Sequence, residues 1–85
     1  MKTILTITGS DSSGISGVQA DIRTIASLGA YAVSAITSIT MQNTIGIQSF
    51  YDLPAATVRG QVEAVVNDVE PQVVKIGMIR RTDVL

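Results

Sequence analysis

Residues 2–40 read KTILTITGSDSSGISGVQADIRTIASLGAYAVSAITSIT, and the fold class can be predicted from their pattern. Residues 2–8 combine β-branched and aliphatic side chains and stop at a glycine, which predicts a buried strand. From Ile15 to Leu28 apolar residues recur at spacings of three and four, which predicts a helix with one apolar stripe. A second β-branched run, residues 31–40, follows almost at once. The stretch therefore predicts a β-α-β unit with parallel strands.

The remainder of the chain continues this alternation. Residues 47–51 predict a short strand, and residues 55–69 carry a valine stripe that predicts a second amphipathic helix. Residues 72–76 then predict a third core strand, because Pro71 ends the helix before them. Thr82 and Asp83 are typical of a helix N-cap and first turn, so they predict the start of a third helix near the last residue, Leu85.

The ends of the predicted strands are the expected place for a site. If every strand presents its carboxyl end to one edge of the sheet, the loops at 9–14, 41–45 and 77–81 cluster at the usual ligand edge of an open parallel sheet. The glycines from Gly9 to Gly17 suggest a phosphate cradle, but their spacing matches neither the dinucleotide fingerprint nor the P-loop. Ordinary turn chemistry explains these small residues equally well.

Composition excludes several classes of protein. The 85 residues hold six Lys and Arg against seven Asp and Glu, so the chain lacks the basic field that nucleic-acid binding needs. No apolar run approaches the about 20 residues of a membrane span, and the amino terminus does not resemble a signal peptide. The absence of cysteine fits a cytoplasmic protein. The absence of histidine removes the usual general base and the commonest metal ligand.

Asp21 is the first candidate site residue. On a helical wheel it falls between Ile25 and Leu28, inside the apolar arc, so its carboxylate does not face water. A buried carboxylate without a partner would cost several kcal/mol, so Asp21 needs a hydrogen-bond donor. That donor is either a group of the protein, such as a loop amide near the helix, or a ligand.

Three further polar or flexible side chains lie at the ends of later predicted strands. Gln42 offers both an acceptor and a donor, which suits a heterocycle with ring nitrogens and an exocyclic amine, although a Gln-Asn-Thr segment is also a common turn. Lys75 could meet a phosphate, or its stem could be buried beneath a head that reaches water. Met78 could be a pocket wall or core filler.

Four segments together resemble the amino-terminal part of hydroxymethylpyrimidine/phosphomethylpyrimidine kinases. The segments are GSDSSG at 9–14, GVQAD at 17–21, QNT at 42–44 and KIGM at 75–78. The resemblance implies an α/β, three-layer ribokinase-like fold. Residues 1–85 would form only the amino-terminal β-α-β-(β)-α-β part of its mainly parallel sheet and of its single kinase domain. It also implies a small-molecule pyrimidine substrate bound by Gly9, Asp21, Gln42 and Met78, and a cytoplasmic role in thiamine biosynthesis.

The same resemblance implies what these residues do not supply. Members of the family use ATP and Mg²⁺, and their anion hole, catalytic aspartate and ATP pocket lie in a carboxyl-terminal portion that has no counterpart in residues 1–85. We therefore expect no catalytic residue, no metal ligand and no phosphoryl transfer by this chain alone. Because a hydrophobic sheet edge and a helix-facing surface would be left uncovered, we also expect the chain to self-associate or to be stable only with other chains. The family usually has Gly-Gly-Ala-Gly where this sequence has Gly14-Ile15-Ser16-Gly17. The alternatives are part of a vitamin B6 kinase and a non-catalytic binding or interaction module.

Overall fold

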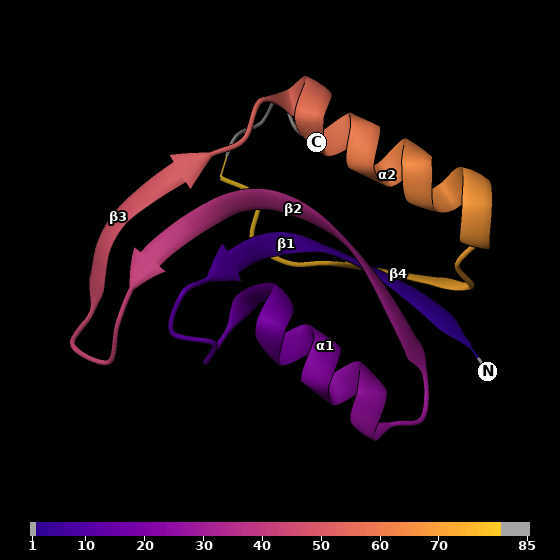
Figure 1. Ribbon diagram of the computed structural model, residues 1–85, viewed down its shortest axis with the longest axis horizontal. Helices are drawn as coiled ribbons and strands as arrows, with labels where there is room; N and C mark the ends of the chain where they lie inside the picture. Colours follow the sequence, from indigo (N-terminus) through magenta and orange to yellow (C-terminus); the bar gives the residue numbers. More distant parts are fainter. Residues whose placement is uncertain (1, 81–85) are drawn as a thin grey trace.

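The computed structural model describes residues 2–80, which form one four-stranded sheet with two helices. The elements are β1 (Thr3–Asp11), α1 (Gly17–Ser27), β2 (Tyr31–Gln42), β3 (Ile47–Asp52), α2 (Ala55–Val69) and β4 (Val73–Ile76). The strand order is β3-β2-β1-β4, with β1 parallel to both β2 and β4. Figure 1 shows α2 on one side of the strands and α1 on the other. The predicted α/β fold with a mainly parallel sheet is confirmed.

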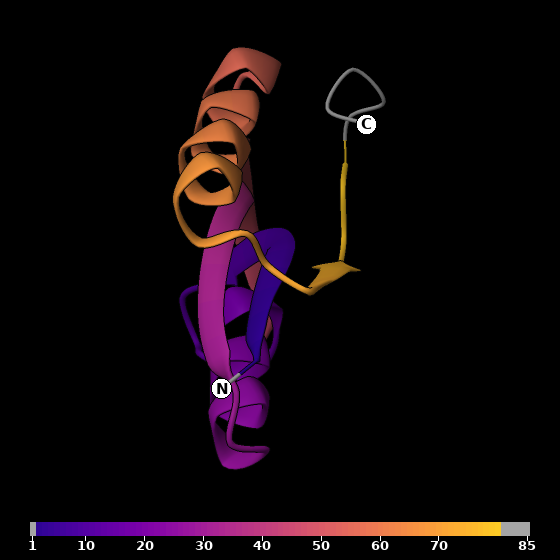
Figure 2. The same ribbon diagram turned by 90° about the vertical axis from the view of Figure 1, so that its right-hand side faces the viewer.

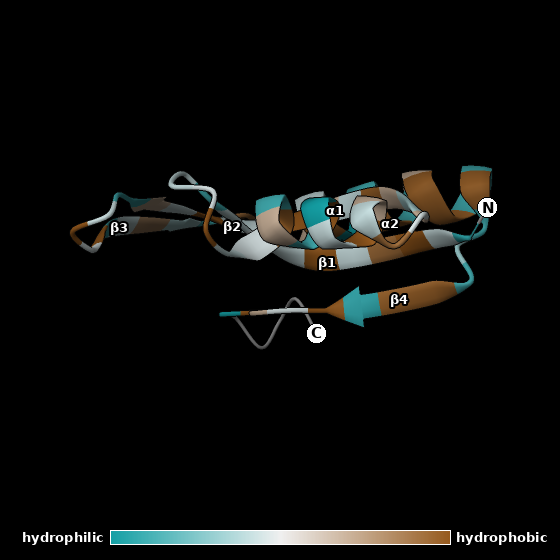
Figure 3. Cartoon of the chain, turned by 90° about the horizontal axis from the view of Figure 1, so that it is seen from below, coloured by the Kyte–Doolittle hydropathy of each residue, from teal (hydrophilic) through white to brown (hydrophobic). Residues whose placement is uncertain are grey.

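The two helices cover only part of the sheet. Figure 2 shows α2 and α1 above and below β2 and β1, while β4 lies to the side. Figure 3 shows β4 as a mostly hydrophobic strand apart from both helices. All four residues of β4 are exposed, although residues 72–76 were predicted to form a core strand. Within residues 2–80, neither helix has the length and apolar character needed to cross a membrane.

The prediction that every strand ends at the same edge is wrong for β3. β3 runs antiparallel to β2 because only residues 43–46 join the two strands, too few for a crossover connection. Within this turn the Asn43 side-chain oxygen accepts a hydrogen bond from the Ile45 amide at 2.9 Å. Residues 47–52 therefore form a hairpin arm beside the end of β2.

The first strand and the first helix also begin or end away from their predicted limits. β1 continues through Gly9 to Asp11, with a shift in its register to β2 between Thr8 and Ser10. α1 starts at Gly17 instead of Ile15, which is 66% exposed. Along the predicted apolar stripe Val18 and Ile25 are buried, but Ile22 is exposed and Leu28 lies beyond the end of the helix. The core is therefore smaller than the stripe predicts.

Side chains of β1 alternate between the two faces of the sheet. Thr6 hydrogen-bonds to α1, whereas Ile7 shares an apolar groove with Val58 and Val62 of α2. Leu5 and Val58 are among the buried apolar residues of the core. Of the valine stripe predicted for residues 55–69, Val58 is buried and Val62, Val65 and Val69 are half-buried, while Val66 beside the stripe is exposed. The helix predicted at Thr82 lies outside the described residues.

Candidate functional site

A cavity of about 360 Å³ lies where β1, β2 and β4 end and α1 begins. The four residues predicted to bind substrate, Gly9, Asp21, Gln42 and Met78, all line it. They come from three different strand ends and one helix, so the fold brings together residues that are up to 69 positions apart in the sequence. Their role in binding remains a prediction, but their convergence on one cavity is a property of the structure.

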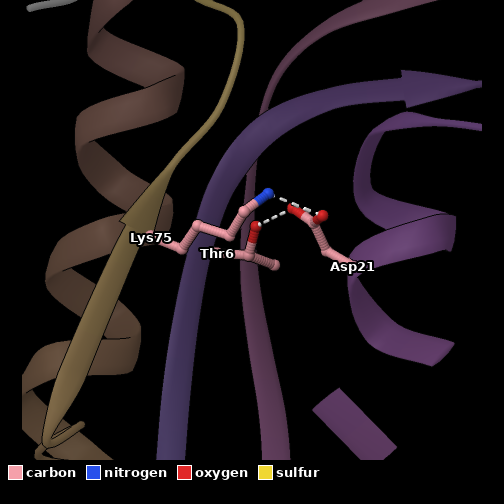
Figure 4. Close-up of polar contacts among 3 residues, drawn as sticks. All are labelled: Thr6, Asp21 and Lys75. Carbon is pink, nitrogen blue, oxygen red and sulfur yellow. Dashed lines mark hydrogen bonds and ion pairs between the residues drawn. The ribbon is translucent and has the colours of Figure 1, made fainter. Parts of the chain in front are cut away.

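Asp21 is held by two donors from the sheet. The Thr6 hydroxyl donates to Oδ2 at 2.6 Å, and the Lys75 ammonium donates to Oδ1 at 2.7 Å (Figure 4). These are the partners that its place on the helical wheel required, and they come from β1 and β4, not from a loop amide. Because β1 and β4 place Thr6 and Lys75 side by side, one carboxylate joins both strands to α1.

This pairing determines the charge state of Asp21. Burial of the carboxylate favours a higher pKa, but the hydrogen bonds from Lys75 and Thr6 and the positive charge of Lys75 together outweigh it. The pKa of Asp21 is consequently lowered, so the side chain is ionised at neutral pH. The Asp21 side chain is 15% exposed and lines the cavity, which leaves an ionised acceptor at the pocket wall.

Lys75 serves this pairing. Of the two uses that the sequence left open, the structure shows neither a free head group nor a phosphate contact: the Lys75 side chain is 54% exposed and its ammonium is bonded to Asp21. Its charge is therefore balanced within the protein. No other lysine or arginine among residues 2–80 lines the cavity. The described part of the pocket thus has no uncompensated cation with which to hold a phosphate chain.

Asp11 organises the loop between β1 and α1, a role that the sequence analysis missed. Its Oδ1 accepts hydrogen bonds from the Ser13 amide and hydroxyl, and its Oδ2 accepts from the Ser16 amide and hydroxyl, all at 2.8 to 2.9 Å. Burial favours a higher pKa for this carboxyl, but these four bonds hold its pKa well below the usual range. The Asp-Ser-Ser order after a strand is the available signal, because aspartate commonly bonds the amide two residues on.

The glycines allow α1 to begin very close to β1. A Cβ atom at Gly9 would lie 2.9 Å from the Ser38 hydroxyl oxygen, and Gly17 has a φ of +68° with its Cα facing the Gly9 carbonyl. A side chain at Gly9 would press against Ser38 of β2, and one at Gly17 would press against the backbone of β1. Close packing therefore accounts for both glycines without a phosphate cradle.

Two serines fasten the end of β2 to this loop. Ser12 Oγ accepts a hydrogen bond from the Gln42 backbone nitrogen at 2.8 Å and donates one to the Gln42 backbone carbonyl oxygen. Ser13 Oγ accepts a hydrogen bond from Gln42 Nε2 at 3.2 Å. Gln42 thereby lines the cavity, whereas Asn43 belongs to the turn between β2 and β3.

The hairpin arm supplies an apolar wall that the sequence analysis did not include in the site. Ile47 and Phe50 of β3 line the cavity together with Met78, which is 50% exposed. The Arg80 guanidinium lies 3.8 Å from the centre of the Phe50 ring and 3.4 Å from Asp52. Arg80 thus ties the segment after β4 to β3. No short-range pattern marks this contact, because 30 positions separate Phe50 from Arg80.

The described residues do not fit a nucleotide with its magnesium ion. Among residues 2–80, no group of three or more Asp, Glu, His or Cys side chains is placed to hold a metal. The two carboxylates that line the cavity, Asp11 and Asp21, are already saturated or paired by side chains of the protein. The cavity is therefore lined by paired polar groups on one side and by apolar side chains of β3 on the other.

Comparisons with known proteins point to one family. The family model described as phosphomethylpyrimidine kinase matches residues 11–85. The chain is 44% identical over 82 residues to the hydroxymethylpyrimidine/phosphomethylpyrimidine kinase of Mycobacterium leprae, covering 96% of this chain and 29% of that protein. The chain thus spans about a third of the length of the curated relatives that it matches.

Solved structures give the same result. The phosphomethylpyrimidine kinase of Clostridium difficile superposes with a TM-score of 0.95 at 45% identity, over 99% of this chain and 36% of that one. The pyridoxal kinase of Staphylococcus aureus, in complex with AMP-PCP and pyridoxal, superposes with a TM-score of 0.89 at 30% identity, over 99% of this chain and 31% of that one. Both are kinases, and the predicted family resemblance is confirmed.

Proposed function

Since the chain belongs to the phosphomethylpyrimidine kinase family, we propose that it supplies the acceptor-substrate pocket of a kinase acting on hydroxymethylpyrimidine and its monophosphate. In this proposal residues 1–85 are the amino-terminal part of a single ribokinase-like domain. The carrying observation is the convergence of Gly9, Asp21, Gln42 and Met78 on one cavity at the carboxyl ends of the parallel strands.

Each wall of the pocket suits one feature of an aminopyrimidine. The ionised Asp21 carboxylate accepts a hydrogen bond from a ring or amino N–H, and Gln42 contributes an amide at the opposite strand end. Met78 and Phe50 provide apolar surface for the faces of the ring. Gly9 adds part of the β1 backbone to the pocket wall.

The phosphoryl donor and its metal are assigned outside the described residues. The S. aureus pyridoxal kinase was solved with AMP-PCP and with ADP, which supports ATP as the donor. ATP with Mg²⁺ would supply the phosphoryl group and neutralise its charge. Residues 2–80 would bind and orient the acceptor and keep its hydroxymethyl group at the open side of the cavity. We place this activity in thiamine biosynthesis in the cytoplasm.

Calorimetry on the complete gene product that contains these residues tests the proposal. Hydroxymethylpyrimidine should bind, and Asp21→Asn should weaken binding about 10- to 100-fold, as expected for the loss of a charged hydrogen bond. Asp68→Asn is the matched control, because Asp68 lies exposed on α2 and is not part of the cavity. Equal affinities for the wild type and Asp21→Asn, with only a lower melting temperature, would assign Asp21 a purely structural role.

A vitamin B6 substrate is the second candidate, because the likeness to pyridoxal kinase extends over nearly the whole chain. Gln42 separates the two candidates. A pyrimidine with an amine beside a ring nitrogen can use both functions of the amide, whereas a pyridoxal-type ring lacks that pair. Gln42→Leu should therefore penalise the pyrimidine more than the pyridine in a competition assay. Equal losses would remove this argument for the pyrimidine.

A further inference from the structure

The polar groups around Gln42 leave its side-chain amide only one favourable orientation. Asp11 is ionised, so both its oxygens only accept hydrogen bonds. The Ser13 hydroxyl lies 2.8 Å from Asp11 Oδ1 and donates its single proton there. The Ser13 oxygen is then left with lone pairs alone. Any group that meets this oxygen from the pocket side must be a donor.

Gln42 meets that requirement with its nitrogen. Nε2 lies 3.2 Å from the Ser13 hydroxyl oxygen, so the amide presents its NH₂ group to the serine. If the amide were turned over, its carbonyl oxygen would face the serine lone pairs, or Ser13 would have to withdraw its proton from Asp11. Among residues 2–80, no hydrogen bond is made to Gln42 Oε1. The carbonyl oxygen and the second N–H of the amide therefore remain for a ligand in the cavity.

We propose that Ser13 is a positioning residue that fixes which end of the Gln42 amide is the acceptor toward the ligand and so favours rings that present an N–H donor at that edge. This inference rests on the proposed function, because it assumes that the cavity binds a heterocycle. The relay runs from Asp11 through Ser13 to Gln42, and each member comes from a different part of the chain: the end of β1, the loop before α1 and the end of β2. A pyrimidine with an exocyclic amine fits it.

Two ligands distinguish this role from simple support of the loop. An aminopyrimidine presents an amine donor beside a ring-nitrogen acceptor. The matched ring, with a carbonyl oxygen in place of the amine, presents an acceptor beside a ring N–H donor. The wild type should prefer the amino ring. Ser13→Ala frees the amide to turn over. The dissociation constant of the carbonyl ring divided by that of the amino ring should therefore fall about 3- to 10-fold, as expected for one neutral hydrogen bond.

Ser12→Ala is the matched control. Ser12 also holds Gln42, but through the backbone nitrogen and oxygen of Gln42. Loss of the Ser12 hydroxyl should therefore weaken the binding of both rings and leave the ratio of their dissociation constants unchanged. Ser13→Thr keeps the hydroxyl and should keep the wild-type ratio. Titrations of the complete gene product measure all four proteins. Equal ratios for Ser13→Ala and Ser12→Ala would overturn the inference.

A measurement without ligand separates this inference from the proposed function. In the ligand-free protein, labelled with ¹⁵N at glutamine, the Gln42 side-chain amide protons should show nuclear Overhauser contacts to the Ser13 β-protons. Their absence would overturn the orientation even if the cavity binds a pyrimidine. If the contacts are present and neither ring binds, the proposed function fails while the orientation of Gln42 stands.

Discussion

The two faces of the sheet differ in how they satisfy their side chains. On the α1 face, Thr6 and Lys75 hydrogen-bond to Asp21, and the polar cavity opens at the end of the same strands. On the α2 face, a groove of about 420 Å³ is lined mainly by apolar residues such as Ile7 and Ile76. Adjacent residues of β1 and β4 contribute to the polar contacts on one face and to the apolar groove on the other, because successive side chains of a strand point to opposite faces.

Specificity and association depend on different faces of this sheet. A polar group with a fixed partner selects a ligand by direction, whereas an apolar surface responds mainly to the area that is covered. We therefore assign recognition to the α1 face. We assign the self-association predicted from the sequence to the α2 face.

The largest expected effect is a complete absence of turnover in the 85-residue chain. Phosphoryl transfer depends on positioning and on stabilising spread-out charge, and the α1 face offers only the acceptor pocket. An ATP-coupled assay with Mg²⁺ and hydroxymethylpyrimidine should show no activity, even in samples that bind the pyrimidine. Turnover that scales with this chain and disappears in Asp21→Ala would place catalytic groups within these residues.

A paired substitution on β4 tests the assignment of association to one face. Ile76 is 60% exposed and lines the apolar groove, whereas Val73 is 45% exposed and pairs with Ile4, three residues before the Ile7–Ile76 pair and thus on the opposite face. Ile76→Glu should weaken self-association of the 85-residue chain roughly tenfold, the value of one buried aliphatic side chain. Val73→Glu should leave it nearly unchanged in sedimentation equilibrium. Equal effects would mean that the edge of β4, not the α2 face, mediates association.

A smaller effect is expected when the support of Asp21 is removed and Asp21 itself is kept. Thr6→Val preserves shape but deletes the hydroxyl that bonds to Oδ2. Pyrimidine affinity in the complete gene product should fall about threefold, within the range for a single neutral donor. Thr24→Val is the control, because Thr24 is exposed on α1 and does not line the cavity. An affinity loss as large as that of Asp21→Asn would show that Thr6 does more than orient the carboxylate.

The smallest effect concerns acid stability. Because the pKa of Asp21 is lowered from 3.8, the carboxylate stabilises the native state at pH values above about 4, and this contribution is lost as pH falls through the native pKa. Urea unfolding of the wild type and Asp21→Asn should thus differ by less than ~1 kcal/mol near neutrality, since Lys75 is half-exposed. The difference should vanish towards pH 2. A gap that widens on acidification would contradict the ion pair.

The sequence predicted those features that depend on local pattern. The β-α-β unit and the position of α2 follow from apolar periodicity, and the inward place of Asp21 follows from its angle on the helix. The start of α1 was misplaced because Ile15 fits the apolar spacing, while Asp11 bonds Ser16 and delays the helix. The burial of Asp11 reverses the usual assumption that an aspartate after a strand faces water.

Features that depend on distant contacts could not be predicted. Lys75 is 54 positions from Asp21, and no spacing rule joins a helix residue to a strand so far along the chain. The same holds for Phe50 in the pocket wall, which depends on the direction of β3. Residues 43–46 did contain a usable signal, because a connection that short favours a hairpin.

The central place of β1 in the sheet also sets an order for folding. Ile4 pairs with Ala32, 28 positions on, and with Val73, 69 positions on. Closing the longer loop costs about 0.8 kcal/mol more in chain entropy, and β4 lacks the helix cover that rewards β2. β4 should therefore dock last, and with it Lys75 and Met78 enter the pocket. A ligand that binds there would favour the fully docked chain by mass action, so ligand binding would stabilise the completely folded state over one in which β4 is undocked.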